Sequence, residues 1–378
     1  LVPAVETFEI VSSHEINPLG RLEMVLPRPE NLRSVRFDGE RAFAVTFEQT
    51  DPLFIIDLSD PANPAQVGEL EMPGWLYHMV PRGDRLLALG FDQGAAEGAM
   101  AVSLFDISDL TKPTMIDRVN FGGDWASMAE DQDRIHKAFN ILDDEGLILV
   151  PYSGWSYSSG NEYYCGRYHS GIQLVDFTND SLTKRGVAAQ HGTARRAFLH
   201  DQRLFAVSDS TVSTFDIADK DAPAPKARLA LSHNAVKAQV VGDYLVRIEG
   251  DWWTDSGLLS VVPVSDPERD QPLGTLDLSG LSDSEGGCYW SYWGFVYGST
   301  VLAVDSYAVL LWNNSYYYGY GGDSGKTGVA VIDLADPTNP KLVSHKTFDF
   351  EFGGWGGYYY GGYGYDSAVM SPGAEYVQ

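Results

Sequence analysis

The stretch 51–74, DPLFIIDLSDPANPAQVGELEMPG, contains two predicted β-strands joined by a tight corner. An apolar run at 53–56 comes first, an alternating run at 66–72 comes last, and Ser59–Pro64 connects them. Proline fixes φ and aspartate can hydrogen-bond its own backbone, so this composition predicts a turn. The same pattern returns at 102–121, 171–188, 212–231, 258–278 and 328–348, and a degenerate copy occupies 5–25.

A second repeated hairpin precedes each complete copy of this pattern. Its clearest example is LRSVRFDGERAFAVTF at 32–47, with relatives at 77–90, 195–208 and 236–248 and looser ones at 136–151 and 292–306. Glycine or aspartate stands at the centre of the clear examples, which is typical of a two-residue hairpin turn. Helical periodicity of useful length is absent, so the sequence predicts an all-β protein.

The spacing of the copies predicts a β-propeller. The aspartate that ends the apolar run, replaced by Val264 in one copy, recurs at separations of 49, 70, 40, 48 and 69 residues. A basal unit of about 40–48 residues with two large insertions suits a blade of four short strands. Six complete units run from 32 to about 350, whereas 367–378 repeats only the first hairpin and 5–25 only the second.

We therefore expect residues 1–378 to form a single β-propeller domain of seven four-stranded blades. The seventh blade would be a composite of 1–31 and 351–378. In it, N-terminal strands C and D would pair with C-terminal strands A and B and close the array. Closure of this kind removes the free sheet edges that a propeller would otherwise expose.

The corner motifs resemble those of a known group of proteins. IIDLSDPANP, LFDISDLTKP, TFDIADKDAP and VIDLADPTNP are similar to LVIVD-type repeats and to secreted bacterial β-propellers distantly similar to WD-repeat proteins. The resemblance covers nearly the whole chain. It implies a propeller fold and a secreted or cell-surface location in a bacterium, and it carries no reaction that could be transferred to this chain.

The charge of the chain restricts the classes of partner that we expect. With 26 Lys and Arg against 52 Asp and Glu, the net charge of -26 opposes binding to nucleic acid or to anionic lipid. No run approaches the roughly 18 to 20 apolar residues that span a bilayer, so no transmembrane segment is predicted. An extracellular protein or glycan is the partner that we expect, with other copies of the chain in an assembly as an alternative.

The predicted insertions all fall at one end of the blades. With strands named A to D from the propeller axis outward, 153–170 and 306–327 are B–C loops and 351–365 is a D–A loop, whereas the Asp-Pro corners are short C–D turns. Most of the 21 tyrosines lie in or beside the insertions. Tyrosine and tryptophan provide large contact areas with a polar tip, so this end suits recognition. The predicted binding residues are Trp155, Tyr157, Tyr163, Tyr164, Tyr168, Trp312, Tyr316, Tyr317, Tyr318, Trp355, Tyr358 and Tyr359.

The function predicted from this pattern is that of a binding or scaffold module. An alternative is an enzyme whose active site lies over the central channel and acts on an anionic or sugar substrate. A second alternative is a structural subunit of a surface assembly, and in a third the aromatic loops only pack on one another. No GxSxG, P-loop or HExxH motif supports an enzyme, and no cofactor is expected.

Basic residues recur at one register position of the first hairpins. Alignment places Ser34, His78, Lys137, Arg196, Lys237, Trp293 and Ser367 there. His78, Lys137, Arg196 and Lys237 could ring the channel mouth and hold an anion or a carboxylate. The alternative is that each pairs with the repeat aspartate of a neighbouring blade.

Two further features bear on ligands and cross-links. Acidic loop residues are candidate ligands of Ca²⁺, namely Asp131, Asp133, Asp251 and Asp255, although they lack the spacing of an EF-hand loop. The two cysteines, Cys165 and Cys288, both belong to predicted loops at the decorated end. They could form a disulfide between two long loops or remain unrelated thiols.

Overall fold

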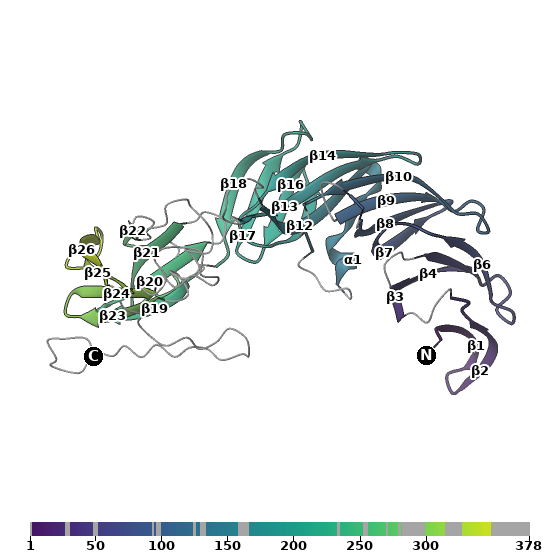
Figure 1. Ribbon diagram of the computed structural model, residues 1–378, viewed down its shortest axis with the longest axis horizontal. Coiled ribbons are helices and arrows are strands. Elements are labelled where there is room, and N and C mark those ends of the chain that lie inside the picture. Colours follow the sequence, from purple (N-terminus) through teal and green to yellow (C-terminus); the bar gives the residue numbers. More distant parts are fainter. Residues whose placement is uncertain are drawn as a thin grey trace. The chain divides into compact units, whose positions relative to one another are not determined.

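The computed structural model describes residues 2–26, 31–47, 52–92, 94–95, 100–123, 126–128, 134–157, 166–232, 235–251, 256–269, 271–278, 281, 299–313 and 327–348. These residues divide into two compact units. The first unit comprises 1–156 and 169–229, and the second comprises 157–168 and 230–378. Each unit is an array of antiparallel sheets (Figure 1).

The all-β prediction is confirmed. The first unit contains a two-stranded hairpin, β1 (Ala4–Ser12) and β2 (Glu15–Glu23), followed by four-stranded sheets in which the strands are neighbours in chain order. The first of these contains β3 (Asn31–Asp38), β4 (Arg41–Phe47), β5 (Leu53–Asp57) and β6 (Ala65–Leu70). The next contains β7 (Trp75–Arg82), β8 (Arg85–Phe91), β9 (Met100–Asp106) and β10 (Thr114–Phe121).

Two more four-stranded sheets complete the first unit. One contains β11 (Asn140–Leu142), β12 (Leu147–Tyr157), β13 (Gly166–Phe177) and β14 (Leu182–Ala189). A one-turn helix, α1 (Ile135–Ala138), precedes β11, and a 3₁₀ turn, η1 (Asp143–Glu145), follows it. The other contains β15 (Ala194–His200), β16 (Arg203–Ser208), β17 (Thr211–Asp216) and β18 (Ala224–Ala230).

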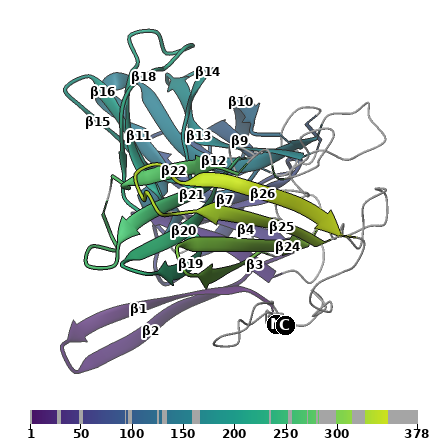
Figure 2. The ribbon, with the colours of Figure 1, turned by 90° about the vertical axis from the view of Figure 1, so that its left-hand side faces the viewer.

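The second unit contains two sheets, both labelled in Figure 2. One comprises β19 (Ala235–Val241), β20 (Tyr244–Asp251), β21 (Ser256–Pro263) and β22 (Gly274–Asp277). The other comprises β23 (Thr300–Val304), β24 (Tyr307–Asn313), β25 (Thr327–Asp333) and β26 (Lys341–Phe348). The described residues thus form six four-stranded sheets and one two-stranded hairpin. This is the number expected for seven blades, because 351–378, the predicted other half of the seventh blade, lie outside the described residues.

The Asp-Pro corner forms by local hydrogen bonding. Asp57 Oδ1 accepts the backbone N–H of Ser59 at 2.9 Å, and Asp60 Oδ1 accepts that of Ala62 at 3.0 Å. The equivalent pairs recur at the later corners, from Asp106 and Asp109, from Asp216 and Asp219, and from Asp333 and Asp336. Two successive aspartate turns thus reverse the chain through hydrogen bonds between residues close in the sequence.

The two short turns of each blade lie at the same end of the sheet. The residue after the repeat aspartate donates its N–H to a carbonyl of the A–B turn, as Leu58 does to Glu40 O at 2.8 Å and Leu334 to Ser306 O at 2.9 Å. Apart from the connection between β11 and β12, which contains η1, the described A–B turns are two-residue hairpins, and Gly39, Gly83 and Gly242 have positive φ in them. The B–C and D–A connections therefore lie at the opposite end, as predicted.

Neighbouring sheets touch where a fourth-strand glycine meets the next corner. A Cβ on Gly68 would lie 2.0 Å from Leu110 O, and one on Gly186 would lie 2.3 Å from Asp221 O. Gly20 of β2 meets Pro61 and Ala62 in the same way, and Thr7 of β1 donates its hydroxyl to Pro61 O. The β1–β2 hairpin thus docks as a C–D strand pair, which supports the prediction that the N-terminal copy is a second hairpin.

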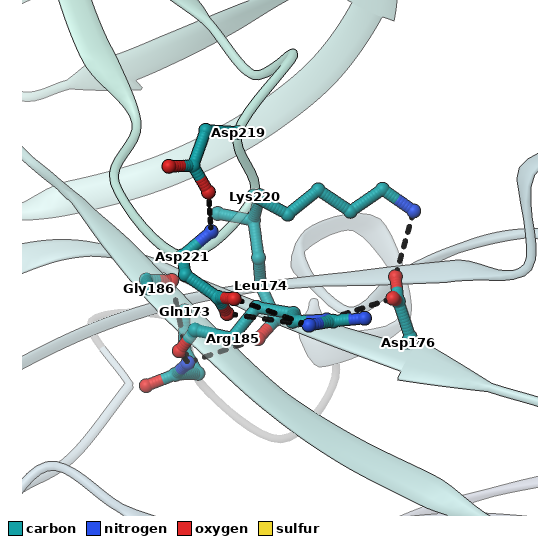
Figure 3. Close-up of polar contacts among 8 residues, drawn as sticks. All are labelled: Gln173, Leu174, Asp176, Arg185, Gly186, Asp219, Lys220 and Asp221. Atoms are coloured by element: carbon teal, nitrogen blue, oxygen red, sulfur yellow. Dashed lines mark hydrogen bonds and ion pairs between the residues drawn. The ribbon is translucent and has the colours of Figure 1, made fainter.

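Charged side chains reinforce one of these contacts. Asp176, the repeat aspartate of β13, accepts Arg185 Nε at 2.8 Å and Lys220 Nζ at 2.7 Å (Figure 3). Arg185 also pairs with Asp221 at 3.2 Å, across the boundary between the two sheets. These side chains are between about a quarter and two thirds exposed, so water screens the network and its stabilising effect is modest.

One predicted hairpin and two predicted loops were placed wrongly. The first hairpin of the last described sheet is β23 and β24, spanning 300–313, and not 292–306. The predicted loops 153–170 and 306–327 are partly strand, because β12 reaches Tyr157, β13 starts at Gly166 and β24 reaches Asn313. Tyrosine and tryptophan occur readily in strands as well as in loops, which is why composition alone did not separate them.

Candidate functional site

Aromatic side chains gather at the decorated end of the β7–β10 sheet. Trp75, which begins β7, and Phe91, which ends β8, are cross-strand partners whose rings stack 4.3 Å apart at 11°. Tyr77 meets Trp75 edge-on at 6.2 Å. All three side chains are half-buried, and burial raises the pKa of Tyr77 above its ordinary value. This cluster presents ring surface beside the B–C and D–A connections.

A second cluster lies at the same end between β10, β12 and β13. The buried ring of Tyr152 contacts Phe121 at 5.5 Å and His169 at 5.8 Å, both edge-on. His169 Nε2 lies 2.9 Å from Gly122 O and donates to it in the Nε2–H tautomer. Burial raises the pKa of Tyr152 to about 12, so its hydroxyl stays protonated. This cluster fixes the loop after β10 against β13.

Sequence reasoning missed these aromatic residues. Trp75, Phe91 and Phe121 lie at strand ends, away from the Tyr-rich segments that drew attention to the insertions. Their position in the sequence could have identified them, because each stands directly beside a D–A or B–C connection. Pro73-Gly74 precedes Trp75, and Gly122-Gly123 follows Phe121. Strand alternation then decides which ring faces the neighbouring strand and which faces solvent.

The predicted register position has a structural counterpart in four sheets. A register shift, marking a β-bulge, occurs immediately before Ser34, His78, Arg196 and Lys237. A bulge turns the following side chain to a new direction, so a repeated bulge makes a repeated position. Ser34 donates its hydroxyl to the carbonyl of Tyr77, the bulged residue of the adjacent sheet, at 3.3 Å.

Two members of the predicted set depart from that position. Lys137 lies in helix α1, where its side chain is exposed, and not in the first strand of its sheet. Cross-strand register places Thr300, opposite Leu311, where Trp293 was predicted. Trp293 and Ser367 lie outside the described residues. The sequence alignment failed at Lys137 because the turn of helix replaces the bulge that four other sheets carry.

The alternative prediction is that these basic residues pair with the repeat aspartates of neighbouring blades. The structure shows other partners for three of those aspartates. The ion-pair partners observed for those aspartates are Arg85 for Asp106, Arg185 and Lys220 for Asp176, and Lys226 for Asp216. These cations come from the second and fourth strands and from a corner. They lie at the short-turn end of the sheets, opposite to His78 and Arg196.

His78 lies near charged groups of two other sheets. Its ring is half-buried and meets Phe139 edge-on at 6.1 Å. Its pKa is lowered to about 4, first by burial and then by the charges of Arg36 from β3 and His136 from α1. The imidazole is therefore neutral at neutral pH, and three blades contribute to its surroundings.

The predicted binding residues have different outcomes. Trp312 is not a surface residue: it lies in β24, is 1% exposed and packs in the core with Leu310 and Ile332. The reason is Gly328 on β25, where a Cβ would lie 2.1 Å from the indole, so glycine makes the room for this ring. Tyr168 is half-buried in β13. Trp155 and Tyr157 belong to β12, and nothing is described of their side chains.

The other predicted residues fall outside the described ranges. They are Tyr163, Tyr164, Tyr316, Tyr317, Tyr318, Trp355, Tyr358 and Tyr359, the cysteines Cys165 and Cys288, and the acidic residues Asp131, Asp133 and Asp255. Asp251 is the last residue of β20, with its side chain undescribed. Within the described ranges no three His, Cys, Asp or Glu side chains gather to hold a metal ion. Nor do these ranges contain a helix long and apolar enough to cross a membrane.

A family model described as a β-propeller domain matches residues 5–220. The chain belongs to the β-propeller domain family. An uncharacterised protein of Archaeoglobus fulgidus is 35% identical over 187 residues, or 50% of this chain and 26% of that protein. One of Methanocaldococcus jannaschii is 37% identical over 118 residues, or 31% of this chain and 18% of that protein. The propeller chain thus spans about a quarter or less of the length of these relatives.

Solved structures resemble the propeller at low identity. Hsv2 of Kluyveromyces marxianus is 13% identical, covers 91% of this chain and 92% of its own, and superposes with a TM-score of 0.32. A hypothetical selenium-binding protein of Sulfolobus tokodaii is 13% identical, covers 91% and 88%, and has a TM-score of 0.33. TM-scores this low carry no argument about function.

Proposed function

We propose that this propeller is an exported or cell-surface binding module that recognises a protein or a glycan through the decorated end of its blades. The observation that carries the proposal is the stacked pair of Trp75 and Phe91 with Tyr77 beside it. Half-buried aromatic rings at the end where the connections vary supply contact area at low entropic cost. The short-turn end is closed by backbone hydrogen bonds and offers little variation on which specificity could rest.

The chain offers a matched control for this site. Phe198 and Phe205 also form a stacked cross-strand pair, with rings 5.2 Å apart at 4°, but they lie near the short-turn end of β15 and β16. Trp75→Ala should weaken binding to a defined glycan or protein ligand by about tenfold or more, whereas Phe198→Ala should leave it unchanged. Deleting 156–168 should also weaken it.

The test uses labelled protein on an array of purified glycans and surface proteins, with each hit titrated against the variants. Equal binding by wild type, Trp75→Ala and the 156–168 deletion would refute recognition through this end. Self-association in sedimentation that is lost in the same variants would favour a subunit of a surface assembly instead. Fractionation of the producing cells tests export, since accumulation in the cytosol contradicts it.

A further inference from the structure

The corner between β13 and β14 has an asparagine where four other corners have an aspartate. Asn179 lies three residues after the repeat aspartate Asp176. The residues at the same distance in the other corners are Asp60, Asp109, Asp219 and Asp336. Each of those four accepts, through Oδ1, the backbone N–H of the residue two positions later, at 2.9 to 3.0 Å. In those corners this position of the repeat closes the turn.

The corner that contains Asn179 closes without the side chain of that residue. Thr178 donates its backbone N–H to Ser181 O at 2.9 Å, and the hydroxyl oxygens of these two residues lie 2.8 Å apart. The N–H of Asp180 donates to Thr178 Oγ1 at 3.2 Å. Asn179 is exposed, and among the described residues no hydrogen bond involves its side chain. The side-chain amide is therefore accessible to another molecule.

Contacts from the preceding sheet hold this corner in place. Arg85 of β8 donates Nε–H to the backbone oxygen of Asn179 at 2.7 Å, and it pairs with the carboxylate of Asp180 at 3.0 Å. After the turn, Asp117 of β10 accepts the N–H of Leu182 at 2.7 Å. The backbone of Asn179 is thus tied to the neighbouring blade while its amide points to none of these partners.

The same corner contains a modification motif. Asn179, Asp180 and Ser181 form the pattern Asn-x-Ser, with no proline in the middle. This pattern is the acceptor for N-linked glycosylation, which adds a bulky and solubilising group at the protein surface. The chain has one other match, at 313–315. Asn313 is the last residue of β24 and lies opposite Thr327 of β25, so that match begins inside a sheet.

We propose that Asn179 is the attachment site of an N-linked glycan at the short-turn end of the first unit. Its Nδ2 forms a bond to the anomeric carbon of a sugar that is activated by a diphosphate group. The bond from that carbon to the diphosphate oxygen breaks, the diphosphate leaves with the electron pair, and Nδ2 loses one proton. The proposal rests on the export that the proposed function includes, because acceptors of this pattern belong to surface loops of secreted proteins. The glycan lies at the end opposite to Trp75, so the aromatic cluster stays uncovered.

The test is mass spectrometry of the full chain purified from the cells that produce it. Trypsin cleaves after Arg167 and Lys184 and releases 168–184, a peptide in which Asn179 is the only asparagine. This peptide should carry the mass of a glycan, and fragmentation should locate that mass on Asn179. Asn179→Gln and Ser181→Ala should lose the added mass completely, whereas Ser181→Thr, which keeps the hydroxyl, should retain it. The matched control Asn313→Gln should leave the glycan on 168–184 unchanged.

The location of the protein separates this proposal from the proposed function. An unmodified 168–184 peptide in protein recovered from the medium or the cell surface overturns the glycosylation and leaves the proposed function standing. An unmodified peptide in protein recovered from the cytosol overturns both the glycosylation and the export. Added mass that persists in Ser181→Ala also overturns the proposal, because the acceptor pattern requires a hydroxyl at that position. A glycan found only on the peptide that contains Asn313 has the same consequence.

Discussion

Replacing Gly186 by alanine tests how closely adjacent blades meet. The new Cβ would lie 2.3 Å from Asp221 O, 2.7 Å from Asp221 C and 2.8 Å from Pro223 Cδ. Two of these atoms are backbone, so the conflict can be relieved only by moving the corner away from β14. That movement breaks the 2.9 Å hydrogen bond from Gly186 N to Lys220 O.

The magnitude follows from two contributions. Overpacking a well-packed contact costs about 1–3 kcal/mol, and the lost backbone hydrogen bond about 1 kcal/mol more. The backbone of Gly186 is not in the left-handed region, so alanine gains about 0.4–1 kcal/mol from the unfolded state in return. A net destabilisation of about 2–3 kcal/mol is expected.

Urea denaturation compares Gly186→Ala with Gly94→Ala. The added Cβ at Gly94 has one neighbour, Asp92 Oδ1 at 3.6 Å, which is an ordinary contact, so this control should stay within about 0.5 kcal/mol of wild type. Hydrogen exchange at 220–222 should accelerate only in Gly186→Ala, because only that substitution opens the corner. Coincident unfolding curves and equal exchange rates for the two variants would refute the tight inter-blade contact.

Three further predictions follow from the described geometry. Trp312→Ala should lower stability by about 3–5 kcal/mol in thermal unfolding, because it empties a buried site that Gly328 cannot fill; an unchanged melting temperature would contradict the core placement. The pKa of Asp57 and that of Asp216 are lowered, first because these carboxylates accept the backbone N–H groups of Ser59 and Ala218. The contribution of the two carboxylates to stability is therefore complete above the ordinary value of 3.8 and is lost as pH falls through the folded pKa. Asp57→Asn should therefore reduce the loss of stability between about pH 6 and about pH 3, measured by urea midpoints, and an unaltered pH dependence would count against it. Deleting 367–378 should destabilise the β1–β2 hairpin if these residues complete its blade, as faster hydrogen exchange in Ala4–Ser12 would show, whereas unchanged exchange rates there would argue against the composite blade.

The short-turn end of the blades could be predicted because its chemistry is local. Each corner forms through the side chain of an aspartate and the N–H two residues later, as at Asp57 and Ser59. Such contacts are encoded within a few residues, so reading the chain is enough to place them. The same holds for the two-residue hairpin turns, where Gly39 and Gly242 take positive φ.

The errors arose where a neighbouring strand or sheet decides the outcome. Trp312 lies beside a Tyr-rich insertion, and only its pairing across β24 and β25 with Gly328 shows that the indole is buried. Lys137 belongs to a segment whose spacing suits a strand but which folds as a turn of helix above β11. Gly328 is too far from Trp312 in the sequence for a local pattern to mark the indole as buried.

The two ends of each sheet differ in how their backbone N–H groups are hydrogen-bonded. At the short-turn end the residue after a repeat aspartate donates its N–H to the A–B turn, as in Ile107 to Asp84 O and Leu334 to Ser306 O. An insertion there would leave buried donors without partners, at a cost of about 1–3 kcal/mol each. At the other end the lengths of the connections differ from blade to blade among the described residues. A change in the connections therefore costs the least stability at the end that carries Trp75, Phe91 and His169.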